Sequence, residues 1–256
     1  MKLSIGLLKA NLRRVFGNHR IYISVLLLAC SLFLSVGDRQ AFCISVINIF
    51  EHAVTSIVFM STFMICAYPY ANVFTEDLEN GFMRYMVIRG GAKQYLWSSV
   101  LMIMLSSIIV MACGCLLFGA ILSIYFPWTD EISLSEMMVG CRWLFQEDTM
   151  WLWMVVWGVR MGIQAAVLSI ASAMFSLFLT NKLMVFIMPA LLYELVQEIN
   201  VELYERGIFL YNRSWFQLNY QPTGDAISTG ISLLLFAGLC IGLMVSVMEV
   251  WIKRRI

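Results

Sequence analysis

Charged side chains are scarce in this sequence. Of its 256 residues, 13% are Asp, Glu, Lys or Arg and 61% are hydrophobic, whereas soluble domains are about 25% charged and about 45–50% apolar. A soluble fold of this composition would expose much apolar surface to water. The apolar runs are continuous rather than alternating, which disfavours a membrane β-barrel. The composition therefore indicates a protein whose helices are embedded in lipid.

Residue patterns that commonly carry catalysis are also lacking. The chain has two histidines, His19 and His52, which fall on opposite predicted sides of the membrane. It contains no HExxH, no GxSxG, no clustered His/Cys/Asp set and no GxxxxGK[ST] phosphate-binding loop. We therefore predict no catalytic residue, metal site or cofactor on this chain. An intramembrane enzyme stays an alternative, although it would need polar groups within the apolar segments.

The seven cysteines do not form a CxxC pair, and most of them fall inside apolar runs. In such positions cysteine acts as a small apolar residue. Cys43 and Cys141 both fall in segments predicted to lie on the outer side of the membrane, where they could pair. The sequence leaves that pairing open, because a disulfide depends on geometry that spacing does not supply.

Six apolar segments predict six transmembrane helices. They lie at about 21–36, 53–74, 96–126, 158–179, 183–199 and 226–250. Residues 1–20 alternate bases and apolar side chains at helical spacing, which predicts an amphipathic interfacial helix. A signal peptide with 21–36 as its apolar region is the alternative, but the run continues past Cys30 and further spans follow.

The bases and acids sort to opposite sides of the predicted membrane. With the amino terminus inside, the inner segments hold 12 of the 17 bases and the outer segments hold 12 of the 16 acids. An excess of Lys and Arg marks cytoplasmic segments. We therefore predict an all-α polytopic membrane protein, a single domain over 1–256 with both termini cytoplasmic.

The longest charged interruption between apolar runs is the segment 75–95. Acids come first, and Glu76, Asp77 and Glu79 would suit the first turn of a short helix, where the helix dipole favours them. Gly81 permits a bend, and Gly90 with Gly91 can end the next helical piece. An ordinary solvated loop is the alternative. The length and chemistry of the segment favour a folded element parallel to the membrane.

This segment resembles the inner loop between the second and third spans in permease subunits of ABC-2 type ABC transporters. The matching residues are Glu76, Asp77, Glu79, Asn80, Gly81, Arg89, Gly90, Lys93 and Tyr95. The six-span layout and the amphipathic amino-terminal helix also resemble that family. The chain departs from it at Trp97 and Ser98, where a further lysine is common.

The resemblance implies a permease subunit that works with a separate ABC ATPase, which would bind ATP and Mg. It also implies a second permease chain in a homodimer, contact with membrane lipids, no nucleic acid, and a bacterial plasma membrane location. Export of a peptide, a drug-like amphiphile or a lipid is expected. A non-transporting scaffold or sensor subunit is the alternative. The implied ATPase-coupling residues are Glu76, Asp77, Glu79, Gly81, Arg84, Arg89, Gly90 and Lys93.

Three further features are candidates for packing or for a substrate pathway. Small residues at four-residue spacing let helices approach closely, and they predict either packing within the chain or a dimer face. Arg160 is a base near a span, at the interface or in the pathway. Acids near the outer end of the fifth span form an acidic vestibule or a solvated helix end. The residues are Gly158, Gly162, Gly238 and Gly242 for packing, and Arg160, Glu194 and Glu198 for the pathway.

Overall fold

The structure, a computed structural model, describes residues 5–37, 45–128, 150–178, 181–205 and 226–255. Across these ranges the regular structure is helical, with no strand. Three helices are long and apolar enough to cross a membrane: α7 (Ala92–Leu122), α9 (Met150–Ser176) and a 20-residue stretch of α12 (Ala226–Arg255). Counting two bent helix pairs as spans brings the number to five. The predicted all-helical membrane class is confirmed at this level.

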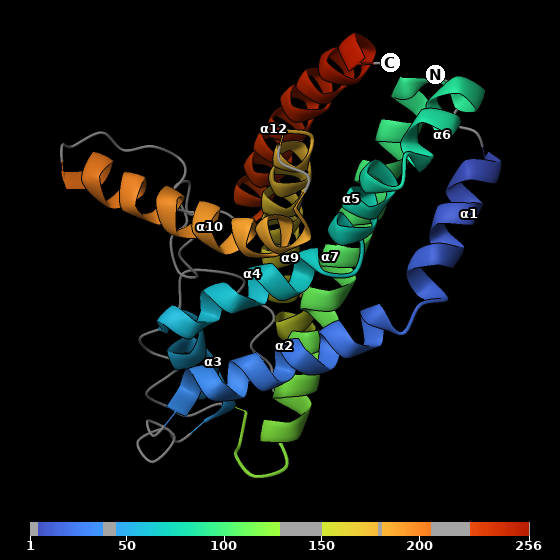
Figure 1. Cartoon of the computed structure of the whole chain (residues 1–256). Coiled ribbons are helices and arrows are strands. Elements are labelled where there is room, and N and C mark those ends of the chain that lie inside the picture. The colour runs from blue at the N-terminus through green and yellow to red at the C-terminus, as the bar shows by residue number, and fades with distance from the viewer. Residues whose placement is uncertain (1–4, 38–44, 129–149, 179–180, 206–225, 256) are drawn as a thin grey trace.

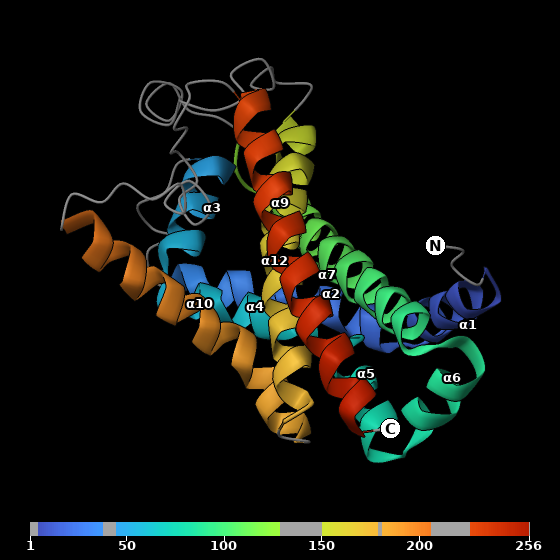
Figure 2. The ribbon, with the colours of Figure 1, turned by 90° about the horizontal axis from the view of Figure 1, so that it is seen from above.

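Helices α7 and α9 pack along each other at the centre of the molecule (Figures 1 and 2). A Cβ built on Gly158 would lie 2.8 Å from the Cα of Ala112, and one on Gly162 would lie 2.7 Å from the Cα of Ile108. These glycines therefore let the two backbones approach closely. Helix α2 (Arg20–Val36) packs on α7, and α12 contacts both central helices.

The second apolar segment, 53–74, is not the single helix that hydropathy predicts. Helix α3 (Val46–Thr55) ends at Ser56, whose backbone is extended. The 3-10 helix η2 (Ile57–Phe59) and α4 (Met60–Ala67) follow at an angle of 79° to α3. The hydroxyl of Ser56 accepts a hydrogen bond from the Val58 amide and so starts the new direction. Helix α5 (Ala71–Glu79) comes after a second break.

The fifth apolar segment lies in α10 (Lys182–Glu205), which runs through Pro189 without a break. Proline has no amide hydrogen, so the carbonyl of Val185, four residues earlier, lacks its helical donor. The Ser172 hydroxyl of α9 donates to that carbonyl at 2.7 Å. Past Tyr193, which stacks on Phe63 of α4 with ring centroids 4.4 Å apart, α10 extends away from the other helices in both views (Figures 1 and 2). Among the described helices it is not one of those long and apolar enough to count as a span.

The amino-terminal helix α1 (Ile5–Phe16) is helical as predicted, but part of its apolar face is covered by the chain itself. Val15 is buried, Leu12 and Phe16 pack against the core, and the Asn11 amide donates to the Ser98 hydroxyl of α7 at 2.8 Å. Helix α6 (Phe82–Gly90) connects α5 to α7. Helices α1 and α6 and the last turns of α12 lie at one end of the molecule (Figures 1 and 2).

Candidate functional site

The acids of segment 75–95 lie at the carboxyl end of a helix, so the prediction that they occupy a first turn is wrong. Helix α5 begins at Ala71, after Pro69 and Tyr70, and ends at Glu79. The helix dipole disfavours negative charge at this end. Bases from other parts of the chain compensate, and they make the end of α5 an ionic cluster of seven side chains: Arg14, Arg20, Glu76, Asp77, Glu79, Tyr95 and Lys182.

Asp77 is the buried centre of this cluster, with its side chain 6% exposed. Arg14 donates to both of its carboxylate oxygens, at 3.1 and 2.9 Å, and the Tyr95 hydroxyl donates at 3.1 Å. The hydrogen bond from Arg14 to Asp77 raises the pKa of the guanidinium, which stays charged. A bidentate arginine–carboxylate pair of this kind fixes the relative orientation of the two side chains as well as pairing their charges. It joins α1, α5 and the start of α7.

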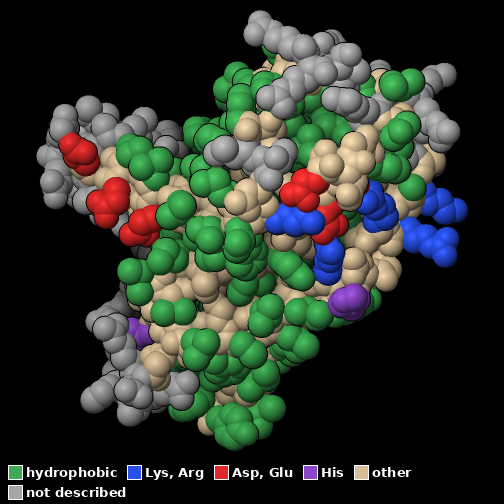
Figure 3. Space-filling view, viewed as in Figure 1, with side chains coloured by type: hydrophobic (Ala, Val, Ile, Leu, Met, Phe, Trp, Pro, Cys, Tyr) green, Lys and Arg blue, Asp and Glu red, His purple; other side chains and the backbone are tan. Residues whose placement is uncertain are grey.

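Glu76 and Glu79 occupy the more exposed side of the cluster, where charged side chains of both signs lie together (Figure 3). Arg20, the first residue of α2, donates to Glu76 at 3.2 Å. Lys182, the first residue of α10, lies 3.2 Å from Glu79 and 4.0 Å from Glu76. The three predicted acids therefore connect helices α1, α2, α7 and α10 to the end of α5.

Helix α6 is bounded by two glycines with positive φ, as predicted. Gly81 has φ of 68° and Gly91 has φ of 82°, a region that glycine adopts without strain. Phe82, Tyr85 and Ile88, spaced by three residues, are 42%, 69% and 75% exposed. Residues spaced in this way share one side of a helix. We call them the α6 stripe.

Four further predicted coupling residues lie in α6 or at the start of α7. Lys93 is exposed at the start of α7. The side chains of Arg84 and Arg89 lie outside the described part of the structure, as do the surroundings of Gly90. The guanidinium of Arg14 lies 5.6 Å from the centre of the Phe82 ring, which links the ionic cluster to the stripe.

The two pairs of small residues occupy different environments. Gly158 and Gly162 face α7 within the chain, as the packing interpretation predicts. At Gly238 and Gly242, a built Cβ would meet nothing within 4 Å. Helix α12 therefore leaves this part of its surface uncovered by the described chain.

The candidate pathway residues lie on two different helices, α9 and α10. Arg160 follows the start of α9 by ten residues, roughly 15 Å at the helical rise, so it lies deeper along the helix than the predicted start of that span implies. Trp157, directly before the predicted start of that span, is buried against Phe50 with ring centroids 4.5 Å apart. Glu194 and Glu198 are exposed on α10, where acidic side chains line its free part (Figure 3).

Two other predictions concern a pair of cysteines and a metal site. Cys43 and Cys141 both lie outside the described residues, so their pairing stays a prediction. Within the described ranges, no group of three or more His, Cys, Asp or Glu side chains could hold a metal ion.

Sequence reasoning missed the partners of the acids. The sequence places Arg14, Arg20 and Lys182 only among the bases on the predicted inner side of the membrane. The available signal was Tyr95, which the motif includes and which donates to Asp77. Gln164 was also missed: it is buried in α9, and both of its amide atoms lack a hydrogen-bond partner in the described structure.

Comparison with protein-family models, with curated proteins and with solved structures finds no match for this chain. A short helix with an exposed apolar stripe stands next to a charge cluster, centred on the buried Asp77, that connects α5 to four other helices.

Proposed function

We propose that this chain is the membrane-spanning permease subunit of an ATP-driven ABC transporter, with hydrolysis on a separate ATPase subunit. The resemblance of segment 75–95 to the ABC-2 inner loop motivates the proposal. The sorting of bases toward that segment supports a cytoplasmic position for it. The sequence has no phosphate-binding loop of its own, so the energy source has to be on a partner.

The observation that carries the proposal is the α6 stripe. Phe82, Tyr85 and Ile88 are exposed on a nine-residue helix between two glycine turns. Aromatic and aliphatic anchors dominate the binding energy of many protein interfaces. We therefore assign the ATPase contact to the stripe. Glu76, Asp77 and Glu79 have partners inside the chain, and we assign them to transmission of the movement.

The proposed mechanism is a two-state displacement of α6. Closure of ATP-bound ATPase subunits would move α6, while Gly81 and Gly91 supply the hinges at its two ends. Asp77 would carry the movement to α1 through Arg14 and to α7 through Tyr95. The two states differ in affinity for the ATPase, which is what a nucleotide-driven shift requires.

A copurification experiment tests the contact. The chain is co-expressed with a candidate ABC ATPase, and the complex is isolated through a tag on the permease. Ile88→Asp places a charge on the stripe and is expected to lower the recovered ATPase at least about tenfold, since a desolvated interface charge costs several kcal/mol. Asn80→Asp adds the same charge to an exposed position off the stripe and is the matched control.

A second variant tests the hinge. Proline fixes φ near −65°, whereas Gly81 has φ of 68°. Gly81→Pro is therefore expected to abolish coupled ATPase activity while membrane insertion persists. Equal ATPase recovery with Ile88→Asp and Asn80→Asp, together with normal transport by Gly81→Pro, would exclude the coupling role. A non-transporting scaffold or sensor subunit would then be the better interpretation.

The proposed assembly is a homodimer of permease chains in a bacterial plasma membrane. The uncovered part of α12 around Gly238 and Gly242 is the proposed place of contact, because small residues at this spacing let helices of two chains approach. Six spans with cytoplasmic termini, and export of a peptide, an amphiphile or a lipid, complete the proposal.

A further inference from the structure

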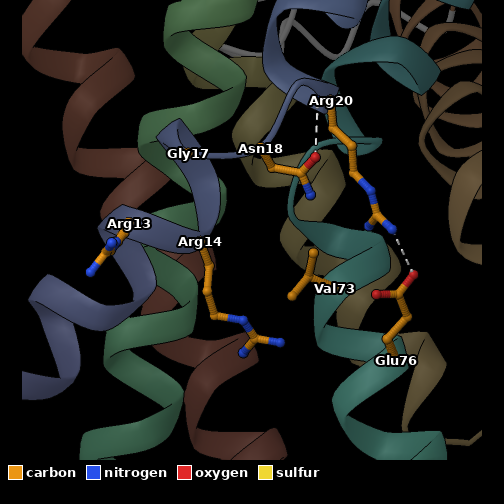
Figure 4. Close-up of a pocket in the computed structure, with 7 residues that line it drawn as sticks. All are labelled: Arg13, Arg14, Gly17, Asn18, Arg20, Val73 and Glu76. Atoms are coloured by element: carbon orange, nitrogen blue, oxygen red, sulfur yellow. Dashed lines mark hydrogen bonds and ion pairs between the residues drawn. The ribbon is translucent and has the colours of Figure 1, made fainter.

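An open pocket of about 320 Å³ lies beside the ionic cluster, where the turn between α1 and α2 faces α5 (Figure 4). Its lining combines three arginines with a single acid. The residues are Arg13, Arg14, Gly17, Asn18, Arg20, Val73 and Glu76. Positive charge exceeds negative charge by two in the lining, and by one when Asp77, which pairs with Arg14 from outside the lining, is included. Such an excess is expected to attract an anion.

Two guanidinium groups approach the pocket from different helices. Arg14 comes from α1 and Arg20 from α2, and the Asn18 side chain lies between them (Figure 4). The side chain of Arg13 points away from the other two, so it contributes charge rather than contact. Asn18 accepts a hydrogen bond from the Arg20 amide at 3.3 Å, which holds the turn in place.

Both arginines keep donors available for a ligand. Each guanidinium carries five N–H groups. Arg14 places two of its nitrogens on Asp77, and Arg20 places one on Glu76. Their side chains are 42% and 26% exposed, so an anion can reach them. The planar fork of arginine matches the oxygen geometry of phosphate, which makes a phosphate group the best-fitting anion.

Glu76 competes with an incoming anion for the guanidinium of Arg20. One of its oxygens accepts a hydrogen bond from Arg20. Lys182 lies 4.0 Å from the same Glu76 oxygen and is not part of the pocket lining. When Arg20 turns to an anion, Glu76 therefore still has a cation beside it. Its negative charge nevertheless weakens anion binding.

The surroundings of the pocket point to a lipid as the source of the phosphate. Immediately after Arg20, the apolar side chains Tyr22, Ile23 and Leu26 are 64%, 41% and 59% exposed on α2. A helix with such a surface belongs in contact with acyl chains. The pocket lies at its polar end, where lipid phosphates meet the hydrocarbon. We infer that this pocket binds a phosphate group, carried by the headgroup of an anionic phospholipid.

A thermal unfolding experiment with the purified full chain in uncharged detergent tests the site. The probes are dioctanoyl phosphatidic acid, dioctanoyl phosphatidylcholine and inorganic phosphate, each titrated separately. Phosphatidic acid is expected to raise the unfolding temperature in a saturable way, and phosphatidylcholine is expected to leave it unchanged. A weaker effect of inorganic phosphate is expected. If inorganic phosphate acts at equal concentrations, the anion site is supported and the lipid source is overturned.

Three variants make the test specific. Arg20→Gln is expected to weaken the apparent affinity for phosphatidic acid about tenfold, the effect of losing one charge-assisted hydrogen bond. Lys9→Gln is the matched control and is expected to retain the wild-type affinity, because Lys9 is exposed on α1 and is not part of the pocket lining. Glu76→Gln removes the competing charge and is expected to tighten binding. This gain keeps the test valid even where Arg20→Gln fails to fold.

The inference is overturned by either of two results: no response to phosphatidic acid or inorganic phosphate, or equal affinities in the wild type, Arg20→Gln and Glu76→Gln. No ATPase takes part in this experiment. The result is therefore independent of the proposed transport function.

Discussion

At the scale of single residues, Asp77 is the side chain on which the candidate site depends. A carboxylate with 6% exposure is costly to bury unless its charge is paired and hydrogen-bonded. Arg14 and Tyr95 supply three hydrogen bonds to it, from positions 63 and 18 residues away in the sequence. Removing one partner would leave a charge in the interior, which costs more than the pair contributes.

Replacement of Arg14 tests this dependence. Arg14→Met keeps much of the aliphatic side chain but removes both donors, and it is expected to lower the free energy of unfolding by about 2 kcal/mol. Unfolding by SDS titration in mixed micelles measures the change. Arg13→Met removes the same charge from the neighbouring exposed position and is expected to change the free energy by less than about 0.5 kcal/mol. Equal effects of the two substitutions would rule out the role of the Asp77 pair.

Sequence reasoning predicted part of this site. Gly81 and Gly91 stand where the sequence places a bend and a helix end, because only glycine adopts these φ values readily. The partners of Asp77 were out of reach, since a single sequence does not show which distant base meets which acid. The orientation of the acids was also wrong, because Pro69 moves the start of α5 and places them in its last turns.

At the scale of elements, α10 shows how a proline is accommodated in a long helix. Pro189 leaves the Val185 carbonyl without its helical donor, and Ser172 supplies one from α9. The bond is buried, where an unsatisfied carbonyl is costly. The contact also fixes the start of α10 against α9. Further along α10, the ring of Tyr193 stacks on Phe63 of α4 with centroids 4.4 Å apart.

A double-mutant cycle on Ser172 and Pro189 tests this explanation. Ser172→Ala is expected to cost about 1–2 kcal/mol of unfolding free energy, because it leaves the Val185 carbonyl unpaired. Pro189→Ala restores the amide donor within α10, so Ser172→Ala should cost much less in that background. SDS titration of the four proteins gives the coupling energy. Additive effects would show that Ser172 does not compensate for the proline.

Ser246→Ala is the control for loss of a serine hydroxyl. The hydroxyl of Ser246 donates to Gly242, four residues earlier in the same helix. That carbonyl also receives the helical amide of Ser246. The substitution is therefore expected to change stability by less than about 0.5 kcal/mol.

The sequence predicts some helices better than others, and the difference has a physical cause. The apolar run at 21–36 corresponds to α2, because an uninterrupted apolar stretch without proline continues as one helix in lipid. The run at 53–74 does not correspond to one helix. Hydropathy averages over a window and is insensitive to the local hydrogen bond by which Ser56 redirects the chain.

At the scale of the whole molecule, the number of crossings decides where the termini lie. Within the described residues, three single helices and two bent pairs give at most five spans by length and composition, an odd number. An odd number would separate the termini across the membrane. Yet α1 and the last turns of α12 lie at the same end as α6 (Figures 1 and 2). That arrangement favours an even number, and α10 is the helix that would supply the sixth crossing.

Reporter fusions decide between the two counts. With six spans, a fluorescent protein at the carboxyl terminus is active, since it folds in the cytoplasm, and alkaline phosphatase inserted within 206–225 is active, since it requires the outside. With five spans, both results reverse, because α10 then fails to cross. A phosphatase insertion within 129–149 is the control and is active in both cases, since it follows the third crossing. The bases Lys253, Arg254 and Arg255 follow the last span, so the positive-inside rule predicts the six-span result.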